Sequence, residues 1–336
     1  MSIKRVGVIG AGSWGTTLAN LLAENGADVL LYVYEKDQLE IMRNTRINDK
    51  YLPGVTLHPR LNFTDELPEA VADKDMILLA VPTHVMRPVV GSIPENDWQG
   101  KLIVNVSKGI ENDTLMRMSE VIADVTGAAA EQIVSLYGPS HAEEVSRKVA
   151  TAVVAASTSL KSARLVRDIF RNEYFRVYSS TDIVGVELGG SLKNVIAIAA
   201  GIADGAGFGD NTKAALITRA LVEMTRLGVT MGAEPETFAG LSGMGDLIVT
   251  CMSRHSRNRH VGEEIGRGKP LQQVLDEMVM VAEGVKTTRS VHQLIGKYQV
   301  EMPISEQVYQ VLFHNKNPHN AVRDLMLRDP KEEARL

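Results

Sequence analysis

The sequence predicts an α/β fold in which a doubly wound, mostly parallel sheet is followed by a mainly α-helical domain. The chain has 336 residues, about twice the usual length of one domain, so two domains are expected. Up to about residue 180, short β-rich apolar runs alternate with amphipathic stretches, the pattern of a parallel sheet with crossover helices. Beyond that point the strand signals fade and long helical periods follow. We therefore place the domains at residues 1–180 and 181–336.

Apolar runs and helical periods give the elements in order. The expected strands are Ile3–Ile9, Asp28–Tyr34, Met76–Val81, Lys101–Val106, Gln132–Tyr137, Thr151–Ala156 and Phe175–Tyr178. The expected helices are Trp14–Asn25, Asp113–Val125, Asp182–Ala203 and Asp210–Met231. Gly26 and Gly127 follow the first two, and a glycine just past a helical period is typical of a C-terminal cap.

Composition narrows the class of protein. Lys and Arg number 36 against 41 Asp and Glu, and this net charge of −5 argues against a general binder of nucleic acid. The lone cysteine, Cys251, can form neither an internal disulfide nor a thiolate metal cluster, which favours a reducing compartment and thus the cytoplasm. Charges or glycines interrupt every apolar run short of the roughly 18 residues of a membrane helix, so no membrane insertion is expected.

The turn after the first expected strand has the G-x-G-x-x-G pattern, as GAGSWG at residues 10–15. Gly10 would allow the tight turn, Gly12 would let the backbone approach a pyrophosphate, and Gly15 would let helix and strand pack closely. Free N–H groups at the start of the helix would bind the anion. This context predicts a Rossmann-type dinucleotide site; a glycine-rich turn without a ligand is the alternative.

The acidic residue expected after the second strand of such a site is Glu35, 20 positions beyond Gly15. Its carboxylate could accept hydrogen bonds from the ribose hydroxyls of NAD and would repel the 2′-phosphate of NADP. Lys36, beside it, could tolerate that phosphate. The cofactor is therefore NAD or NADP, with NAD favoured.

Lys193 is the first catalytic candidate. Its neighbours three and four positions away on the expected helix are glycine, isoleucine and alanine, so no acid can pair with it along that helix. Such a lysine is expected at an interface or cleft, where desolvation lowers its pKa. A lysine that snorkels at the domain edge is the alternative. Asn194 follows it as a candidate polar contact.

Asp246 and a basic segment supply further candidates. Asp246 begins an apolar helical run, so it is either an N-cap or a functional acid, and Thr250 shares its helix face. The basic segment RHSRNRH, residues 254–260, suits a solvated loop, a nucleic-acid contact or a small-phosphate site. Lys108 follows an expected strand at the sheet edge where doubly wound folds place ligands. The histidines lack the spacing of a zinc site, so no metal is expected.

Several motifs occur together and in a fixed order. They are GAGSWG at 10–15, YLPG at 51–54, VP at 81–82, SKG at 107–109, YGPSHAEE at 137–144, ELGGSLKNVIAI at 187–198, DGAGFGDNTKAALITR at 204–219, GLSGMGDLIVTC at 240–251, SRNR at 256–259 and EG at 283–284. In these segments, and over nearly its whole length, the chain resembles the NAD(P)-dependent sn-glycerol-3-phosphate dehydrogenases of the bacterial type.

The resemblance implies reversible hydride transfer between NAD(P)H and dihydroxyacetone phosphate, giving sn-glycerol 3-phosphate for phospholipid synthesis. It implies that Lys193 is the proton donor and acceptor and that Asp246 is its electrostatic partner. The implied substrate contacts are Lys108, Gly138, Ser140, Asn194, Ser256, Arg257 and Asn258, to which we add Asp246 and Thr250. The implied cofactor contacts are Ser13, Trp14, Tyr34, Lys108, Ala142, Arg257, Val281 and Glu283, beside Gly10, Gly12, Gly15 and Glu35 from the turn itself.

One departure and two alternatives bear on this expectation. Many bacterial members carry His or Arg just after the second strand, whereas this chain has Val33-Tyr34-Glu35, which resembles NAD-specific members; Tyr34 could stack on the adenine. A β-hydroxyacid-type dehydrogenase is one alternative, and a non-catalytic dinucleotide-sensing protein is the other. The expected partner is a small phosphorylated substrate, with no nucleic acid, and a homodimer is left open.

Overall fold

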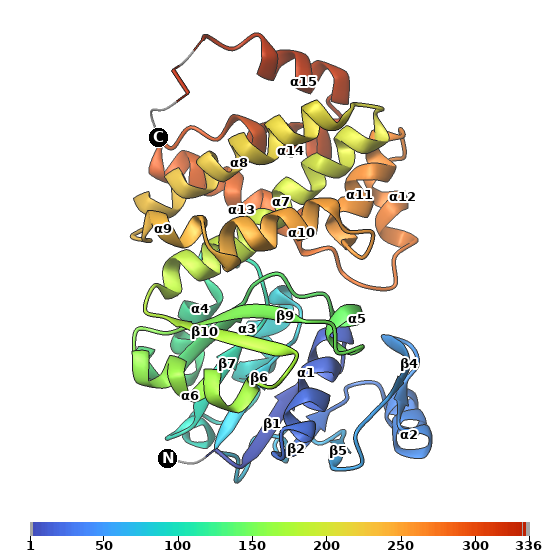
Figure 1. The fold of residues 1–336 in the computed structure, drawn as a ribbon, viewed down its shortest axis with the longest axis vertical. Coiled ribbons are helices and arrows are strands. Elements are labelled where there is room, and N and C mark those ends of the chain that lie inside the picture. Colours follow the sequence, from blue (N-terminus) through green and yellow to red (C-terminus); the bar gives the residue numbers. More distant parts are fainter. Residues whose placement is uncertain (1–2, 331, 334–336) are drawn as a thin grey trace. The chain divides into compact units, whose positions relative to one another are not determined.

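The computed structural model describes residues 3–330, 332 and 333, and the chain divides into two compact units (Figure 1). The first unit holds the described residues up to Ser107 together with Met118–Ile183. The second holds Lys108–Arg117 together with the described residues from Val184 onward. A short segment from the middle of the sheet region therefore belongs to the helical unit. The boundary that the sequence places after residue 180 stays a prediction.

The first unit is built on an eight-stranded sheet in the order β10-β9-β8-β7-β6-β1-β2-β5. All neighbouring strands pair in parallel except β8 and β9, which are antiparallel and are joined through a helix of only four residues. The strands are β1 Arg5–Ile9, β2 Asp28–Tyr32, β5 Leu61–Thr64, β6 Met76–Leu79, β7 Leu102–Asn105, β8 Ile133–Tyr137, β9 Thr151–Ala156 and β10 Phe175–Ser180. This mostly parallel sheet, followed by a helical region, confirms the predicted fold class.

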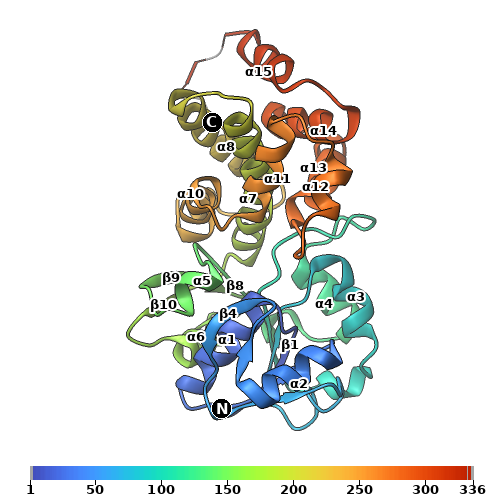
Figure 2. The same ribbon diagram turned by 90° about the vertical axis from the view of Figure 1, so that its right-hand side faces the viewer.

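Helices cover both faces of this sheet (Figure 2). Leu18 and Leu22 of α1 and Phe170 of α6 share one core with alternate strand residues such as Val6 and Val8. The helices α3 and α4 lie on the other side of the sheet (Figure 2). The bounds are α1 Ser13–Glu24, α2 Lys36–Thr45, α3 Thr83–Gly91, α4 Met118–Thr126, α5 Ala142–Val145 and α6 Leu160–Phe170, with 3-10 turns at Glu95–Trp98 and Ala130–Gln132.

Two predictions for the region before residue 180 differ from the structure. The strand β5 and the two-stranded hairpin of β3 Ile47–Asn48 and β4 Leu52–Thr56 are not among the predicted strands, because their short runs contain polar residues or Pro53-Gly54. The helix predicted over Asp113–Val125 is wrong in its first part, since α4 begins only at Met118. Before it, Leu115 has a left-handed backbone with φ of 61° and Ile110 bridges to Arg117.

The second unit is helical around the long helix α7, Ile183–Gly205. By length and composition α7 could span a membrane, but 94% of its most apolar window is buried inside the protein, so it is a core helix. The other helices are α8 Asp210–Thr230, α9 Pro235–Phe238, the π-helical turn η3 Leu241–Gly245, α10 Asp246–Met252, α11 Arg257–Gly266, α12 Leu271–Asp276, α13 Glu283–Tyr298, α14 Pro303–His314 and α15 Pro318–Met326.

Glycines bring the elements around α7 into backbone contact. A Cβ on Gly201 of α7 would lie 2.0 Å from the carbonyl oxygen of Arg259, and one on Gly262 of α11 would lie 2.0 Å from that of Ile198. A Cβ on Gly189 would lie 2.6 Å from the carbonyl oxygen of Ser242 in η3. Larger residues at these glycines would push α11 and η3 away from α7.

Candidate active site

The glycine turn of the first unit has the geometry that the motif predicts. Gly10 has a φ of +113°, and a Cβ there would lie 2.7 Å from the carbonyl oxygen of Ala80. A Cβ on Gly15 would lie 1.9 Å from the carbonyl oxygen of Gly10, whereas one on Gly12 would meet no described atom within 4 Å. Helix α1 begins directly afterwards at Ser13, with Trp14 next. This turn fits a pyrophosphate, because backbone N–H groups at a helix start can approach it without a side chain in the way.

A buried asparagine supports the turn. Asn48 of β3 is fully buried, and its Nδ2 donates to the carbonyl oxygen of Ala11 and to Oγ1 of Thr16, both at 2.8 Å. Gln38 of α2 donates to the Asn48 Oδ1 at 3.0 Å. Sequence reasoning missed Asn48, and the only nearby signal was the YLPG motif that follows it.

The end of β2 carries the acidic residue that the motif requires. Glu35 is the N-cap of α2, and its Oε1 accepts hydrogen bonds from Lys50 Nζ at 2.6 Å and from the Tyr51 hydroxyl at 3.1 Å. Tyr34, just before it, is 82% exposed. Lys36 points instead to Asp65, at 4.0 Å. Neither Lys50 nor Tyr51 was a predicted site residue.

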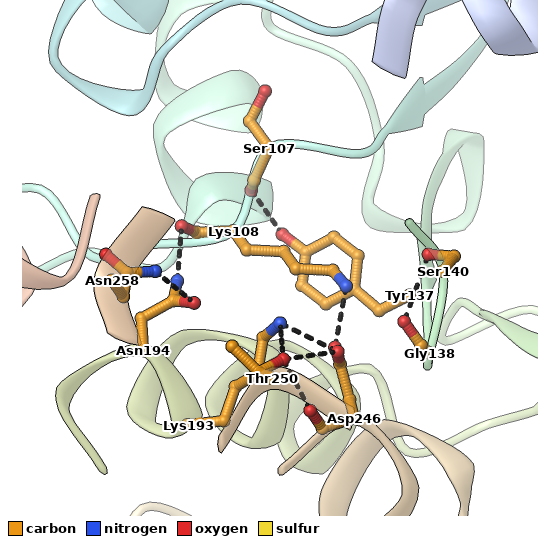
Figure 3. A network of polar contacts seen from close by, with 10 residues as sticks. All are labelled: Ser107, Lys108, Tyr137, Gly138, Ser140, Lys193, Asn194, Asp246, Thr250 and Asn258. Carbon is orange, nitrogen blue, oxygen red and sulfur yellow. Dashed lines mark hydrogen bonds and ion pairs between the residues drawn. The ribbon is translucent and has the colours of Figure 1, made fainter. Parts of the chain in front are cut away.

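The remaining predicted residues of the first unit follow β8. The Ser140 hydroxyl donates to the carbonyl oxygen of Gly138 at 3.1 Å (Figure 3). Ala142 is the first residue of α5. Nearby, the buried Tyr137 hydroxyl donates to the carbonyl oxygen of Ser107 at 2.5 Å. This bond fixes the chain immediately before Lys108.

In the second unit, two lysines share one buried carboxylate (Figure 3). Lys193 Nζ lies 2.7 Å from Asp246 Oδ1, and Lys108 Nζ lies 2.6 Å from Asp246 Oδ2. Lys193 also donates to the Thr250 Oγ1 at 2.7 Å. Asp246 is 1% exposed and Lys193 6%. With both amines protonated, this cluster has two positive charges and one negative charge, so its net charge is +1.

Burial and these neighbours shift the pKa values of the cluster. Burial lowers the pKa of Lys193 to about 8, although the Asp246 carboxylate acts in the opposite direction. Burial alone would raise the pKa of Asp246, but the ammonium groups of Lys108 and Lys193 hold it below its ordinary value. The Cys251 thiol, on the same helix, has its pKa raised to about 12 by burial and is no nucleophile at neutral pH.

The structure decides between the two interpretations of Asp246. Its backbone is already helical, Gly245 is the N-cap of α10, and the carboxylate faces two lysines, so the N-cap interpretation is wrong. The close approach of η3 to α7 at Gly189 sets this geometry, because it brings the start of α10 beside Lys193. The snorkelling interpretation of Lys193 is likewise wrong, since its amine is buried.

A chain of amides joins this cluster to the neighbouring helices. Asn258 Nδ2 donates to Asn194 Oδ1 at 2.9 Å (Figure 3). Asn258 Oδ1 accepts a hydrogen bond from the Gly284 N–H at 2.9 Å. Asn194 in turn donates to the carbonyl oxygen of Lys108 at 3.5 Å. One polar network therefore joins Lys193, Asn194, Asp246, Thr250, Asn258 and Lys108. Ser256 and Arg257 have other partners.

The segment that carries Lys108 has its own anchors in the helical unit. Arg117 Nη1 lies 2.7 Å from Glu187 Oε2, and the Glu187 side chain is 1% exposed. The Ser290 hydroxyl donates to the Asn112 side chain at 2.7 Å. Local sequence patterns gave no signal for either contact, because the partners lie far apart along the chain.

The basic segment at 254–260 is a loop only up to Ser256, so the loop interpretation holds for its first part alone. Ser256 caps α11 by accepting a hydrogen bond from the Arg259 N–H at 3.2 Å, and residues from Arg257 onward are helical. Arg259 pairs with Asp204, with Nη2 at 2.6 Å from Oδ2. Arg257 Nη1 donates to the carbonyl oxygen of Val281 at 2.9 Å, just before Glu283 begins α13.

Among the residues that the structure describes, no group of three or more His, Cys, Asp or Glu side chains is arranged to hold a metal ion. The ionisable groups of the cluster are amines and one carboxylate.

Comparison with known proteins gives the family. The model for the NAD-dependent glycerol-3-phosphate dehydrogenase N-terminus matches residues 5–163, and the model for the C-terminus of the same family matches residues 182–323. The chain belongs to the NAD-dependent glycerol-3-phosphate dehydrogenase family. This membership bears out the resemblance seen in the sequence.

Relatives cover the full length of the chain. The glycerol-3-phosphate dehydrogenase (NAD(P)+) of Geobacter sulfurreducens is 56% identical over 98% of this chain and 99% of its own. That of Chlorobium phaeobacteroides is 51% identical over the same shares. Among solved structures, the glycerol-3-phosphate dehydrogenase of Coxiella burnetii is 35% identical with a TM-score of 0.91, covering 97% of this chain and 99% of that one.

Proposed function

We propose that this chain is a glycerol-3-phosphate dehydrogenase, which reversibly transfers a hydride between NAD(P)H and C2 of dihydroxyacetone phosphate to give sn-glycerol 3-phosphate. The observation that carries the proposal is the buried Lys193 ammonium on the Asp246 carboxylate, in a chain of this family. Reduction of a carbonyl needs a hydride, a positive charge beside the developing oxyanion and a proton for it. The bound coenzyme supplies the hydride.

Lys193 supplies the other two requirements. As an ammonium, its Nζ stabilises negative charge on the substrate oxygen and then donates the proton to it. In the reverse direction the neutral amine accepts that proton. Asp246 keeps the amine in place and favours its charged form, and Thr250 fixes a second hydrogen bond of the same amine. A pKa near 8 suits both directions, because either form is then accessible near neutral pH.

The net positive charge of the cluster matches a phosphorylated substrate. We assign to substrate binding Lys108, Gly138, Ser140, Asn194, Asp246, Thr250, Ser256, Arg257 and Asn258. We assign to coenzyme binding Gly10, Gly12, Ser13, Trp14, Gly15, Tyr34, Glu35, Lys108, Ala142, Arg257, Val281 and Glu283. We further propose that the enzyme works in the cytoplasm and makes the glycerol backbone of phospholipids.

Coenzyme oxidation by the purified chain tests the proposal. NADH and NADPH are each mixed with dihydroxyacetone phosphate, with unphosphorylated dihydroxyacetone or with a β-keto acid. We expect oxidation that depends on dihydroxyacetone phosphate and is far slower with the other two. Oxidation by the β-keto acid alone would support the β-hydroxyacid dehydrogenase instead, and coenzyme binding without turnover of any substrate would support the sensing protein.

A further inference from the structure

The Glu35 carboxylate is not alone at the end of β2. Lys50 and Tyr51, both from the turn between β3 and β4, donate to it at 2.6 and 3.1 Å. Both bonds end on Oε1, and no described residue donates to Oε2. Glu35 can therefore accept a ribose hydroxyl on Oε2 while an ammonium group stays beside its other oxygen.

Lys50 changes the charge that a 2′-phosphate would face beside Glu35. Alone, the Glu35 carboxylate would repel the phosphate, but the Lys50 ammonium cancels that charge from within hydrogen-bond distance. The bond to Glu35 also raises the pKa of Lys50, so the amine is charged at neutral pH. Its side chain is 43% exposed, and an ammonium has three donors, so it can reach a second anion without leaving the first.

The backbone next to Lys50 is anchored to the glycine turn. Asn48, two residues earlier, is buried and bonded to Ala11 of the glycine turn and to Thr16 of α1. Lys36, the lysine next to Glu35 in the sequence, is less constrained, because its side chain is 86% exposed and lies 4.0 Å from Asp65. Of the two amines, Lys50 is thus the one whose position is fixed relative to the turn.

We propose that Lys50 is the specificity-determining residue that admits the 2′-phosphate of NADP(H), its ammonium bridging Glu35 and the phosphate, while Glu35 alone serves NAD(H). The inference rests on the proposed function only in that the dinucleotide binds at the glycine turn with its adenosine ribose at Glu35. It makes Lys50, rather than Lys36, responsible for the use of both coenzymes.

Equilibrium binding of NADH and NADPH, followed by coenzyme fluorescence, tests the proposal without turnover. Lys50→Gln should raise the Kd for NADPH roughly ten-fold, because a charge-assisted hydrogen bond is lost and Glu35 is left uncompensated. The Kd for NADH should stay within about three-fold. Lys50→Arg should retain NADPH binding, and the matched control Lys36→Gln should leave the ratio of the two Kd values unchanged. Adding salt should weaken NADPH binding more in the wild type than in Lys50→Gln.

The outcomes separate this inference from the proposed function. Equal changes of both Kd values in Lys50→Gln would overturn the role of Lys50. A larger change of the ratio of Kd values in Lys36→Gln than in Lys50→Gln would do the same. Neither result would contradict the proposed dehydrogenase function. Wild-type chain that binds neither coenzyme would overturn the proposed function itself. Thermal unfolding of each variant shows whether a lost affinity reflects a lost fold.

Discussion

At Lys193, burial and the Asp246 carboxylate act on the amine in opposite directions, and burial dominates, so the pKa falls to about 8. The reduction needs the ammonium and the oxidation needs the amine. We therefore expect kcat/KM for dihydroxyacetone phosphate to fall as the pH rises through about 8, and the rate of glycerol 3-phosphate oxidation to rise there.

Asp246→Asn removes the charge that favours the ammonium form of Lys193, so both transitions should move to lower pH. Profiles of rate against pH in both directions check this, and an unmoved transition in Asp246→Asn would count against Lys193 as the titrating group.

Lys193 also permits a test of its chemical role. Lys193→Ala should reduce turnover by about 10²-fold to 10⁴-fold, the usual contribution of one positioned proton donor, and the loss of alkoxide stabilisation adds to this. Binding of NADH should change little, because Lys193 is not among the residues that we assign to coenzyme binding. Steady-state kinetics and coenzyme titration measure the two effects. Near-normal kcat in Lys193→Ala would remove it from catalysis.

Arg257 can be tested by a change that keeps its charge. Its guanidinium donates to the carbonyl oxygen of Val281, and we assign Arg257 to the substrate phosphate. Arg257→Lys cannot form the same fork, so kcat/KM for dihydroxyacetone phosphate should fall by about one to two decades, or 1.5 to 3 kcal/mol. Unphosphorylated dihydroxyacetone should lose less, and the Kd for NADH is measured beside it. Equal losses for both substrates would mean that Arg257 only braces the segment at Val281.

Among the elements, the segment Lys108–Arg117 depends on a buried ion pair. Arg117 and Glu187 lie 2.7 Å apart with side chains 12% and 1% exposed. Removing one partner of a buried ion pair lowers the free energy of unfolding by about 3 to 5 kcal/mol, because the charge of the other partner stays buried without compensation from it. Glu187→Ala should therefore lower the free energy of unfolding by about that much and reduce kcat/KM, because Lys108 is on the same segment. Chemical denaturation measures the first effect.

A double variant separates charge from packing at this pair. Arg117→Met with Glu187→Met buries no charge and should recover much of the stability, while Lys108 loses part of its anchoring. A Glu187→Ala variant as stable as the wild type would show that the segment is held by its other contacts, such as that of Ser290 with Asn112.

The same elements show what sequence can and cannot predict. Strands β1 and β6 were predictable because a parallel strand buried on both faces is a continuous apolar run. The glycine turn was predictable because its motif and geometry are local. The position of Lys108–Arg117 was not, since its partners lie on α7, α10 and α13, and no local period encodes contacts at that separation. The sequence singled out Lys193 because no acid lies three or four positions from it on its own helix. Its partner Asp246 lies 53 residues away, where no local pattern could indicate it.

For the whole molecule, no single cut in the sequence separates the two units, because each unit combines two separate stretches of the chain. The helical unit takes Lys108–Arg117 from within the region that the N-terminal family model covers. A fragment that begins at Val184 would therefore contain the buried Glu187 without Arg117, and the Asp246 carboxylate without Lys108. A loss of about 3 to 5 kcal/mol at Glu187 alone is a large share of the 5 to 15 kcal/mol that usually stabilises a domain.

We expect the fragment of residues 184–336 to be marginally folded, with a broad thermal transition and fast amide hydrogen exchange on α7. Joining Lys108–Arg117 to its N-terminus through a flexible glycine-serine linker should restore a cooperative transition, because Arg117 again pairs with Glu187. The matched control carries Arg117→Met in that joined segment and should not restore it. Circular dichroism and hydrogen exchange on the three fragments measure this directly. If the fragment of residues 184–336 melts as cooperatively as the joined one, the helical unit folds without the segment, and a simple boundary near residue 180 describes the domains.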